Sequence, residues 1–197
     1  MKKGGNKRRV RNEVRIIGGR LRGRVIEFEN SNNIRPTGNR SREQLFDWLG
    51  PVIQGADCAD LFAGSGALSF EALSRGATRC LSIDINSRAV RSLRHNAQKM
   101  DGSKIKVINS DSWRLAKKFA RLPFDLIFID PPFSDNYVCD LCLDLEANCW
   151  LKAVAYIYIE APVKRDLLQV PTNWELWRQD VTGKVKSLLY KRVETDR

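Results

Sequence analysis

The chain lacks any long hydrophobic run. Its longest uninterrupted apolar stretch, residues 153–159, has seven residues, whereas a helix that spans a membrane needs roughly 20. The basic segment before residue 25 does not lead into the short apolar core of a secretory signal either. We therefore expect a protein that neither spans a membrane nor is secreted. A length of 197 residues predicts one domain with a substantial core.

Histidine and paired cysteines are also scarce. Cys139 and Cys142 have the spacing of a CxxC pair, but the chain holds no second pair and its one histidine, His95, is distant in sequence. Because zinc sites combine several such ligands at short spacings, we expect no metal site. The five cysteines are odd in number and scattered through apolar segments, which is typical of reduced thiols in a cytoplasmic protein.

Acidic residues are nearly absent from the first 24 residues. This segment contains ten Lys and Arg against one acid, Glu13, which gives +9 of the total formal charge of +11. The rest of the chain is therefore close to neutral. A basic arm of this kind most often contacts nucleic acid phosphate, and the simpler alternative is a solubilising tail.

The apolar pattern after residue 56 alternates between strands and helices. Apolar segments predict strands at 59–62, 80–85, 104–108, 124–129 and 154–159. Helical spacing predicts helices at 41–49, where residues 41–44 have the pattern of a capping box, and at 67–75, 87–100, about 115–119 and 138–145. This alternation predicts an α/β fold with a doubly wound parallel sheet, which binds ligands at the carboxyl ends of its strands.

Two hairpins are expected outside this alternation. Residues 14–17 and 21–28 predict a hairpin with Gly18-Gly19 as its turn, because glycine supplies the positive φ that a two-residue turn requires. This hairpin would place Arg20, Arg22 and Arg24 on one face of a strand. Residues 174–181 and 185–191 predict an antiparallel hairpin at the edge of the main sheet.

The first candidate site follows the strand at 59–62. Gly64 and Gly66 separate this strand from a helix, so the backbone can turn tightly and a ligand can approach the helix N-terminus. Asp84 ends the next strand, where a carboxylate can accept hydrogen bonds from ribose hydroxyl groups. Together these residues predict an adenosine cofactor, and both a nicotinamide dinucleotide and S-adenosylmethionine suit this layout.

Two acids favour S-adenosylmethionine. Asp60 precedes the glycines and would repel a pyrophosphate, but it suits the ammonium and sulfonium groups of a zwitterionic cofactor. Asp111 follows the third strand and is placed to accept a hydrogen bond from an adenine amino group. The alternative for Asp111 is the N-cap of the following helix.

The second candidate site follows the strand at 124–129 and reads Asp130-Pro131-Pro132-Phe133. An exocyclic amino group becomes nucleophilic when acceptors localise its lone pair, and the Asp130 carboxylate and the Pro131 carbonyl supply two acceptors. The prolines fix the turn, and the Phe133 ring offers a face on which a flipped base can stack. The alternative is a rigid exit from the strand with Asp130 as a cap.

The loop from Asp60 to Gly66 together with Asp130 to Phe133 resembles class I, S-adenosylmethionine-dependent amino-methyltransferases. The segments that narrow this resemblance are Arg15 to Gly19 with Arg22 to Arg24, Arg35 to Thr37 with Arg40, Arg42 and Glu43, Leu61 to Leu68 with Glu71 to Arg75, and Tyr158 to Glu160. They resemble the RsmD family, whose members methylate the N2 amino group of one guanine in bacterial 16S ribosomal RNA. The resemblance runs from about Val14 to Arg192.

The resemblance implies a Rossmann-like class I methyltransferase fold. We expect a seven-stranded, mostly parallel sheet with an antiparallel C-terminal hairpin, and a small basic β-hairpin at the N-terminus. We expect an RNA-contacting arm and hairpin at residues 1–38 and a methyltransferase domain at residues 39–197. The implied cofactor is S-adenosylmethionine, with S-adenosylhomocysteine as product, and the implied partner is small-subunit ribosomal RNA within a ribosomal particle. A cytoplasmic monomer without a metal is expected.

The same resemblance implies the site residues. Asp130, Pro131, Pro132 and Phe133 would act on the target guanine. The cofactor would be contacted by Asp60, Phe62, Ala63, Gly64, Gly66, Asp84, Ile85, Asp111, Ser112, Arg35 and Thr37. RNA would be contacted by Arg15, Arg20, Arg22, Arg24, Arg40 and Arg42.

Other functions stay open at this point. An amino-methyltransferase that acts on DNA adenine shares the Asp130 motif, whereas one that acts on a protein glutamine typically has Asn at this position and has no need of a basic arm. A nicotinamide-dependent dehydrogenase leaves the Asp130 motif without a purpose. A non-catalytic RNA-binding factor in ribosome assembly would use the fold only as a scaffold, and the intact Asp130 and glycine loop argue against it.

Overall fold

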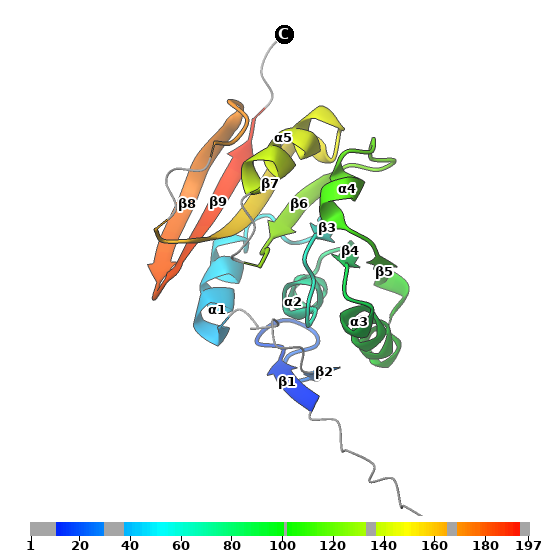
Figure 1. The fold of residues 1–197 in the computed structure, drawn as a ribbon. Helices are drawn as coiled ribbons and strands as arrows, with labels where there is room; N and C mark the ends of the chain where they lie inside the picture. Colours follow the sequence, from blue (N-terminus) through cyan, green and yellow to red (C-terminus); the bar gives the residue numbers. More distant parts are fainter. Residues whose placement is uncertain (1–10, 30–37, 101, 133–136, 165–168, 194–197) are drawn as a thin grey trace, which may run out of the picture.

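The computed structural model describes residues 11–29, 38–100, 102–132, 137–164 and 169–193. Within these residues the main sheet has seven strands in the order β5-β4-β3-β6-β7-β9-β8, and a separate hairpin, β1-β2, precedes it (Figure 1). The five strands from β5 to β7 in this order are parallel to one another, and β9 pairs antiparallel with both β7 and β8. This is the Rossmann-like architecture that the sequence predicts, with both expected hairpins.

The elements have the following bounds. The N-terminal hairpin consists of β1 (Arg11–Arg15) and β2 (Val25–Glu29). The main sheet consists of β3 (Asp57–Asp60), β4 (Arg79–Asp84), β5 (Ile105–Asn109), β6 (Phe124–Ile129), β7 (Leu151–Pro162), β8 (Trp174–Thr182) and β9 (Val185–Arg192). The helices are α1 (Asn39–Trp48), α2 (Ala67–Ser74), α3 (Ser87–Lys99), the short 3-10 helix η1 (Gly102–Lys104), α4 (Ser112–Ala116) and α5 (Val138–Ala147).

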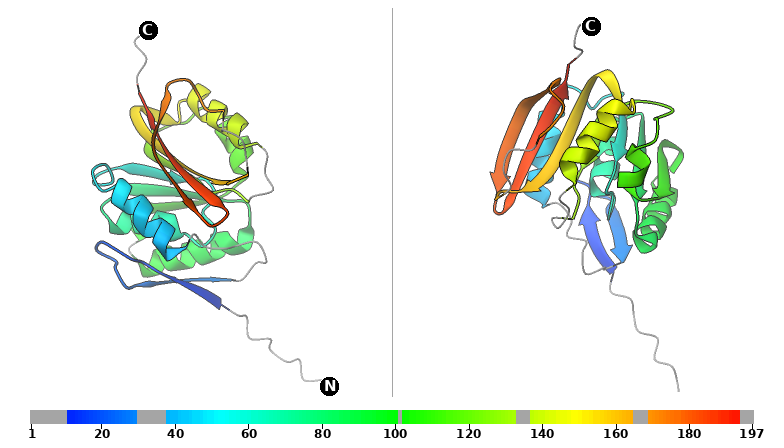
Figure 2. Two further views of the ribbon diagram at one scale, coloured as in Figure 1. Left: turned by 90° about the vertical axis from the view of Figure 1, so that its left-hand side faces the viewer. Right: turned by 45° about the horizontal axis from the view of Figure 1, so that its top comes forward.

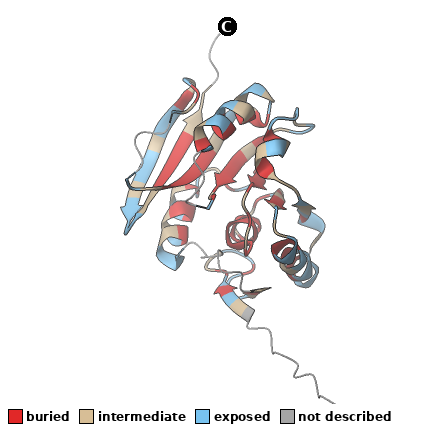
Figure 3. Cartoon of the chain, in the orientation of Figure 1, coloured by how far each residue is buried: buried red, intermediate tan, exposed pale blue. Residues whose placement is uncertain are grey.

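Helices cover both faces of the sheet. The core on one face joins α1, α2 and α3 to Phe128 and Tyr158, and the core on the other joins α4 and α5 to Ile127 and Ile157. Figure 2 shows the hairpin β1-β2 outside the first helix layer. Since α2 lies between sheet and hairpin, all its residues are buried, whereas α3 buries one stripe (Figure 3). Among the described helices, none has both the length and the apolar character that crossing a membrane requires.

Most predicted elements occur close to their predicted bounds. The segment at 124–129 is β6 with these same ends, and it is apolar because it is a central strand buried on both faces. The capping-box prediction at residues 41–44 is wrong, since α1 begins at Asn39. Gly38 has the extended conformation that precedes a helix, and its carbonyl already accepts from the Arg42 N–H at 3.0 Å.

The N-terminal hairpin forms, but its connection differs from the prediction. Residues 16–24 form a longer loop between β1 and β2 instead of a two-residue turn at Gly18-Gly19. The predicted strand face of Arg20, Arg22 and Arg24 does not form, since all three lie in this loop.

Contacts with α2 explain the longer loop. The Ile17 and Gly18 N–H groups each donate to the Glu71 carboxylate at 2.8 Å, and the Arg20 N–H donates to the Ser74 carbonyl at 2.7 Å. A Cβ atom on Gly19, whose φ is +73°, would lie 1.9 Å from that same carbonyl oxygen. Glycine is therefore required here by close approach to α2, and the backbone of the loop is held by hydrogen bonds to a helix.

Candidate active site

Carboxylates occur at the ends of four adjacent parallel strands. Asp84 ends β4, Asp60 ends β3, Asp130 directly follows β6, and Glu160 directly follows the last residue of β7 that pairs with β6. These strands are neighbours in the order β4-β3-β6-β7 and run in one direction. The four acids therefore lie along the carboxyl edge of the sheet, where a doubly wound sheet binds its ligands.

The glycine loop between β3 and α2 is held against β4. The Ala63 N–H donates to the Ile83 carbonyl at 2.9 Å, and the Gly64 N–H donates to Asp84 Oδ2 at 2.8 Å. Gly66 precedes α2 with a φ of +85°, and a Cβ atom there would lie 2.5 Å from Leu93. Both the backbone conformation and the packing beneath it thus require glycine at this position.

Asp84 holds two loops at once. Besides Gly64, the Asn86 N–H donates to its other carboxylate oxygen at 2.7 Å. Burial raises the pKa of Asp84, and these two backbone hydrogen bonds oppose that rise. Each carboxylate oxygen has a second lone pair, so Asp84 can still accept a hydrogen bond from a hydroxyl group of a ligand.

Asp60 supports the loop from beneath. Its side chain is buried, and Oδ2 accepts from the Ser69 hydroxyl at 2.6 Å, which in turn accepts from Ser82 at 2.7 Å. Burial raises the pKa of Asp60 to about 6. The printed hydrogen bond of this carboxylate is thus with α2, and the cofactor contact of Asp60 stays a prediction.

Asp111 and Ser112 also bind within the protein. Asp111 is the N-cap of α4, and its carboxylate accepts from the Trp113 N–H at 2.9 Å. The Ser112 hydroxyl, which is buried, donates to the Leu61 carbonyl. The N-cap alternative for Asp111 is thus confirmed, and Ser112 ties the start of α4 to the glycine loop.

Apolar side chains line the same edge. The ring centroids of Phe62 and Trp113 are 5.2 Å apart, and the Tyr137 ring meets Trp113 edge-on at 6.2 Å. Tyr137 is 63% exposed and Ile85 is 71% exposed. The sequence interpretation included Phe62 and Ile85 but missed Trp113 and Tyr137, although each lies next to a loop at the carboxyl edge.

The Asp130 motif leaves the sheet beside β7. Asp130 is partly buried, Pro131 is buried and Pro132 is exposed. The strand register places Asp130 beside Glu160, whose carboxylate accepts from the buried Tyr158 hydroxyl at 2.8 Å. Phe133, like Arg35 and Thr37, lies outside the described residues.

The predicted RNA-contacting arginines fall into different places. Arg15, Arg20, Arg22, Arg24 and Arg40 are exposed. The Arg20 N–H contacts the C-terminal end of α2, and Arg24 Nη1 donates to the Lys99 carbonyl at the C-terminal end of α3. The N-terminal ends of these two helices lie at the carboxyl edge of the sheet. At 1.5 Å per residue, α2 is roughly 12 Å long and α3 roughly 20 Å long, so the two contacts are about these distances from that edge.

Arg42 was also predicted to contact RNA, but the structure places its side chain inside the protein. Its side chain is fully buried, and Nη2 donates to the Arg15 carbonyl at 3.1 Å and to Asn39 Oδ1 at 2.7 Å. Nη1 lies 4.0 Å from the buried Glu71 carboxylate, which also accepts from Arg75 at 2.8 Å. Arg42 and Glu71 therefore fasten the hairpin to α1 and α2.

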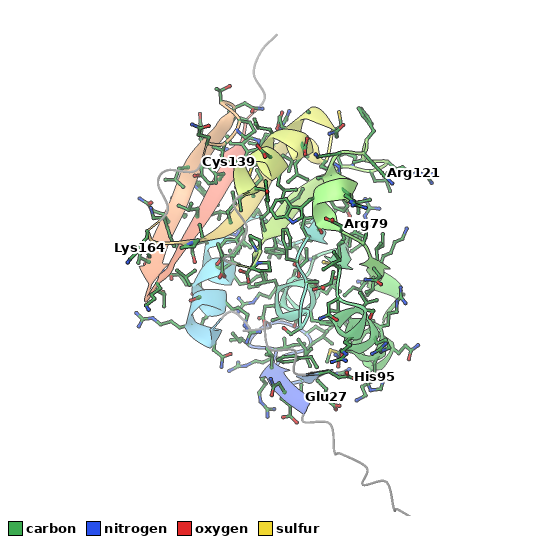
Figure 4. The ribbon with its side chains drawn as sticks, in the orientation of Figure 1. Glu27, Arg79, His95, Arg121, Cys139 and Lys164 are labelled. Carbon is green, nitrogen blue, oxygen red and sulfur yellow. The ribbon has the colours of Figure 1, made fainter. Side chains whose placement is uncertain are left out.

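The described residues contain no group of three or more His, Cys, Asp or Glu side chains that could hold a metal ion. Figure 4 shows His95 on α3 and Cys139 on α5, far apart across the molecule. All five cysteines are free thiols.

The chain matches known proteins over most of its length. The model of the family described as Conserved hypothetical protein 95 matches residues 14–191. Ribosomal RNA small subunit methyltransferase D of Escherichia coli (strain K12) is 42% identical over 181 residues, which cover 91% of this chain and 90% of that protein. The protein of the same name from Haemophilus influenzae is 41% identical over 185 residues, which cover 92% and 95%.

Solved structures agree with these relatives. A putative methyltransferase of Escherichia coli has 39% sequence identity and a TM-score of 0.87, and the match covers 93% of this chain and 100% of that one. A putative methylase of Haemophilus influenzae has 37% identity and a TM-score of 0.79, with the same coverage. From the span of the family model and the coverage of these relatives, the chain belongs to the family described as Conserved hypothetical protein 95, the RsmD family.

Proposed function

We propose that this protein transfers a methyl group from S-adenosylmethionine to the exocyclic N2 amino group of a guanine in small-subunit ribosomal RNA within a ribosomal particle. Family membership supports a methyltransferase, and the names of its relatives support ribosomal RNA as substrate. The observation that carries the finer proposal is Asp130-Pro131-Pro132 at the end of β6, the strand next to β3, which leads into the glycine loop held by Asp84.

The residues at the carboxyl edge fit this cofactor. S-adenosylmethionine combines an adenine ring, ribose hydroxyl groups and a positively charged sulfonium centre, which supplies the electrophilic methyl group. Asp84 has lone pairs for ribose hydroxyl groups, and the exposed Ile85 side chain offers an apolar surface to adenine. Asp60 and Asp84 place negative charge around the glycine loop, which suits a cation and opposes a pyrophosphate.

The acceptor chemistry belongs to Asp130 and Pro131. The lone pair of an exocyclic amino nitrogen is conjugated with its ring, so the nitrogen is a weak nucleophile. Hydrogen bonds from its two N–H groups to the Asp130 carboxylate and the Pro131 carbonyl localise that lone pair and orient the nitrogen. As the bond between nitrogen and the methyl carbon forms, the bond between that carbon and sulfur would break and its electron pair would go to sulfur. The nitrogen would then give up one proton, for which the hydrogen-bonded Asp130 carboxylate is the nearest proposed acceptor.

RNA binding is assigned to the basic N-terminal region. Residues 1–24 carry +9 of the formal charge, and the side chains of Arg15, Arg20, Arg22 and Arg24 are exposed. Phosphate contacts of this kind position an RNA without reading its bases. Arg42 and Glu71 hold the hairpin in a fixed place on the helix layer, so its orientation relative to Asp130 is fixed as well.

Methyl transfer to defined substrates tests this proposal. The protein is incubated with S-adenosylmethionine labelled in its methyl group and with small ribosomal subunits, the corresponding free RNA, duplex DNA or a release factor. We expect label in small-subunit RNA, with the assembled subunit as the better substrate. Label in DNA or in the release factor, with none in ribosomal RNA, would contradict the proposal and move the Asp130 motif to another acceptor.

A further inference from the structure

Glu160 is the direct neighbour of Asp130 across two parallel strands. β6 and β7 pair in register up to Ile129 and Ile159, so Glu160 is the next residue of β7 and Asp130 is the residue that directly follows β6. Parallel strands lie roughly 4.8 Å apart, and residues two apart on a strand share a face. Asp130 and Glu160 therefore follow Phe128 and Tyr158 on the same face of the sheet, and both lie at its carboxyl edge.

Hydrogen bonds orient the Glu160 side chain. The Tyr158 hydroxyl lies 2.8 Å from Glu160 Oε1 and 3.0 Å from the Ser187 hydroxyl on β9. All three side chains are buried, and Glu160 is 6% exposed. Burial and the charge of Glu160 raise the pKa of Tyr158 well above its usual value, so its hydroxyl stays protonated and donates to the carboxylate. Side chains of β7 and β9 thus fix the orientation of the Glu160 carboxylate.

A buried carboxylate needs hydrogen-bond donors, and the Tyr158 hydroxyl is one donor to Glu160 Oε1. An apolar side chain would fill the end of β7 without the free-energy cost of removing a charge from water. This carboxylate instead lies beside the residue that binds the acceptor nitrogen. A second hydrogen-bond acceptor at that point matters only for a substrate that presents two neighbouring donors.

Guanine presents such donors. Its Watson–Crick edge carries the N2 amino group and, next to it, an N1–H group, whereas adenine has an unprotonated acceptor at N1. An edge that enters the site with N2 toward Asp130 can turn N1 toward either neighbouring strand, and only toward β7 does N1 meet Glu160. A carboxylate there accepts a hydrogen bond from the N1–H group of guanine. With adenine it faces the N1 lone pair instead, so the two groups repel and the buried carboxylate loses this hydrogen bond.

We propose that the Glu160 carboxylate accepts the N1–H of the target guanine and so selects guanine over bases that lack this hydrogen. Tyr158 and Ser187 act as positioning residues, because they orient the carboxylate without touching the base. This inference rests on the proposed function, since it requires that the N2 amino group be the methyl acceptor.

The test compares guanine with 2-aminopurine at the methylated position of the RNA. 2-Aminopurine keeps the N2 amino group but has an acceptor at N1 and lacks the O6 atom. The wild-type protein should methylate guanine about 10- to 100-fold faster, as expected for one hydrogen bond to a charged group. Glu160→Gln should lower kcat/KM on guanine by a similar factor and bring the ratio between the two bases close to one.

Controls separate this role from support of the fold. Glu175→Gln changes an exposed carboxylate on β8 and should leave the ratio unchanged. Tyr158→Phe keeps the carboxylate and should reduce the ratio only in part. A guanine to 2-aminopurine ratio near one for the wild-type protein would overturn the inference, whether or not the variants fold. A ratio that Glu160→Gln leaves unchanged would also overturn it, because O6 and not N1–H would then account for the discrimination. Failure of the wild-type protein to methylate the guanine substrate would instead count against the proposed function.

Discussion

At the scale of single residues, Asp60 and Asp130 end neighbouring strands but lie in different surroundings. Asp60 is buried and bound by Ser69, whereas Asp130 is partly exposed at the start of the proline turn. A carboxylate beneath the glycine loop can support the loop and its charge, but it cannot reach an acceptor base. Support of the loop is therefore the role of Asp60, and the proposed chemistry belongs to Asp130.

Asp60 gives the stability of the protein a pH dependence. Its pKa is raised from 3.8 to about 6 in the folded state, so the folded protein binds the proton more tightly than the unfolded chain does. Stability should then fall as the pH rises from about 4 to 6, by about 2 to 3 kcal/mol, and stay level above that range. Asp60→Asn should remove this fall. Urea unfolding at pH 4 to 7 checks it, and parallel curves for the two proteins would contradict the expected titration.

Asp130 should affect turnover and not cofactor affinity. In Asp130→Ala the acceptor nitrogen loses its carboxylate partner, so methyl transfer should drop by at least about 100-fold, as for loss of a group that acts in the transition state. Calorimetry with S-adenosylmethionine should give a nearly unchanged Kd. Asp140→Ala, an exposed acid on α5, serves as the control and should leave both quantities unchanged. Unchanged turnover of Asp130→Ala would show that Asp130 does not act in methyl transfer.

The candidate site could be predicted only in part from the sequence. Asp84, Gly64 and Gly66 were identified because a glycine loop and an acid follow consecutive strands, and this order is visible in the chain. Arg42 was assigned to RNA from the family resemblance, together with Arg40 on the same helix. Its burial depends on Glu71, which is distant in sequence and lies beneath the hairpin.

At the scale of elements, the parallel strands were the most predictable part. β6 is a run of apolar residues because helices cover both of its faces, and burial of this kind is visible in the chain itself. The loop at residues 16–24 was not predictable in the same way. Gly18-Gly19 permits a tight turn locally, but hydrogen bonds to Glu71 and Ser74 favour a different path.

Two glycines in this loop give a matched test of its docking. Gly19 and Gly23 have similar positive φ values, +73° and +84°, but a Cβ atom would meet the Ser74 carbonyl only at Gly19. Gly23→Ala should cost about 1 to 2 kcal/mol of stability from backbone strain alone. Gly19→Ala should cost more, because the hairpin must also move away from α2. Thermal unfolding measures both, and equal losses would mean that the contact with α2 contributes nothing.

At the scale of the whole molecule, Arg20 and Arg24 of the basic hairpin lie at the helix ends opposite the carboxyl edge of the sheet. The net charge of +9 lies in residues 1–24, whereas the carboxyl edge of the sheet carries four acids. An RNA substrate would have to extend from one region to the other. This arrangement suits recognition of a folded RNA or particle by shape, with phosphate contacts at a distance from the modified base.

Removal of residues 1–10 tests the contribution of the arm. The deletion leaves β1 intact and removes Lys2, Lys3, Lys7, Arg8 and Arg9. Affinity for small-subunit RNA should fall, and the slope of log K against log salt should flatten by up to about 3 to 4. Binding titrations at several salt concentrations measure this slope. An unchanged slope would show that these five charges make no phosphate contact.

The identity of the methylated nucleoside tests the central claim most directly. Small-subunit RNA is treated with the protein and S-adenosylmethionine, digested to nucleosides and analysed by mass spectrometry against standards. The account predicts N2-methylguanosine, formed by the wild-type protein and not by Asp130→Ala. Methylation of a ring nitrogen of guanine, or N6-methyladenosine, would contradict the assignment of Asp130 and Pro131 to the N2 amino group.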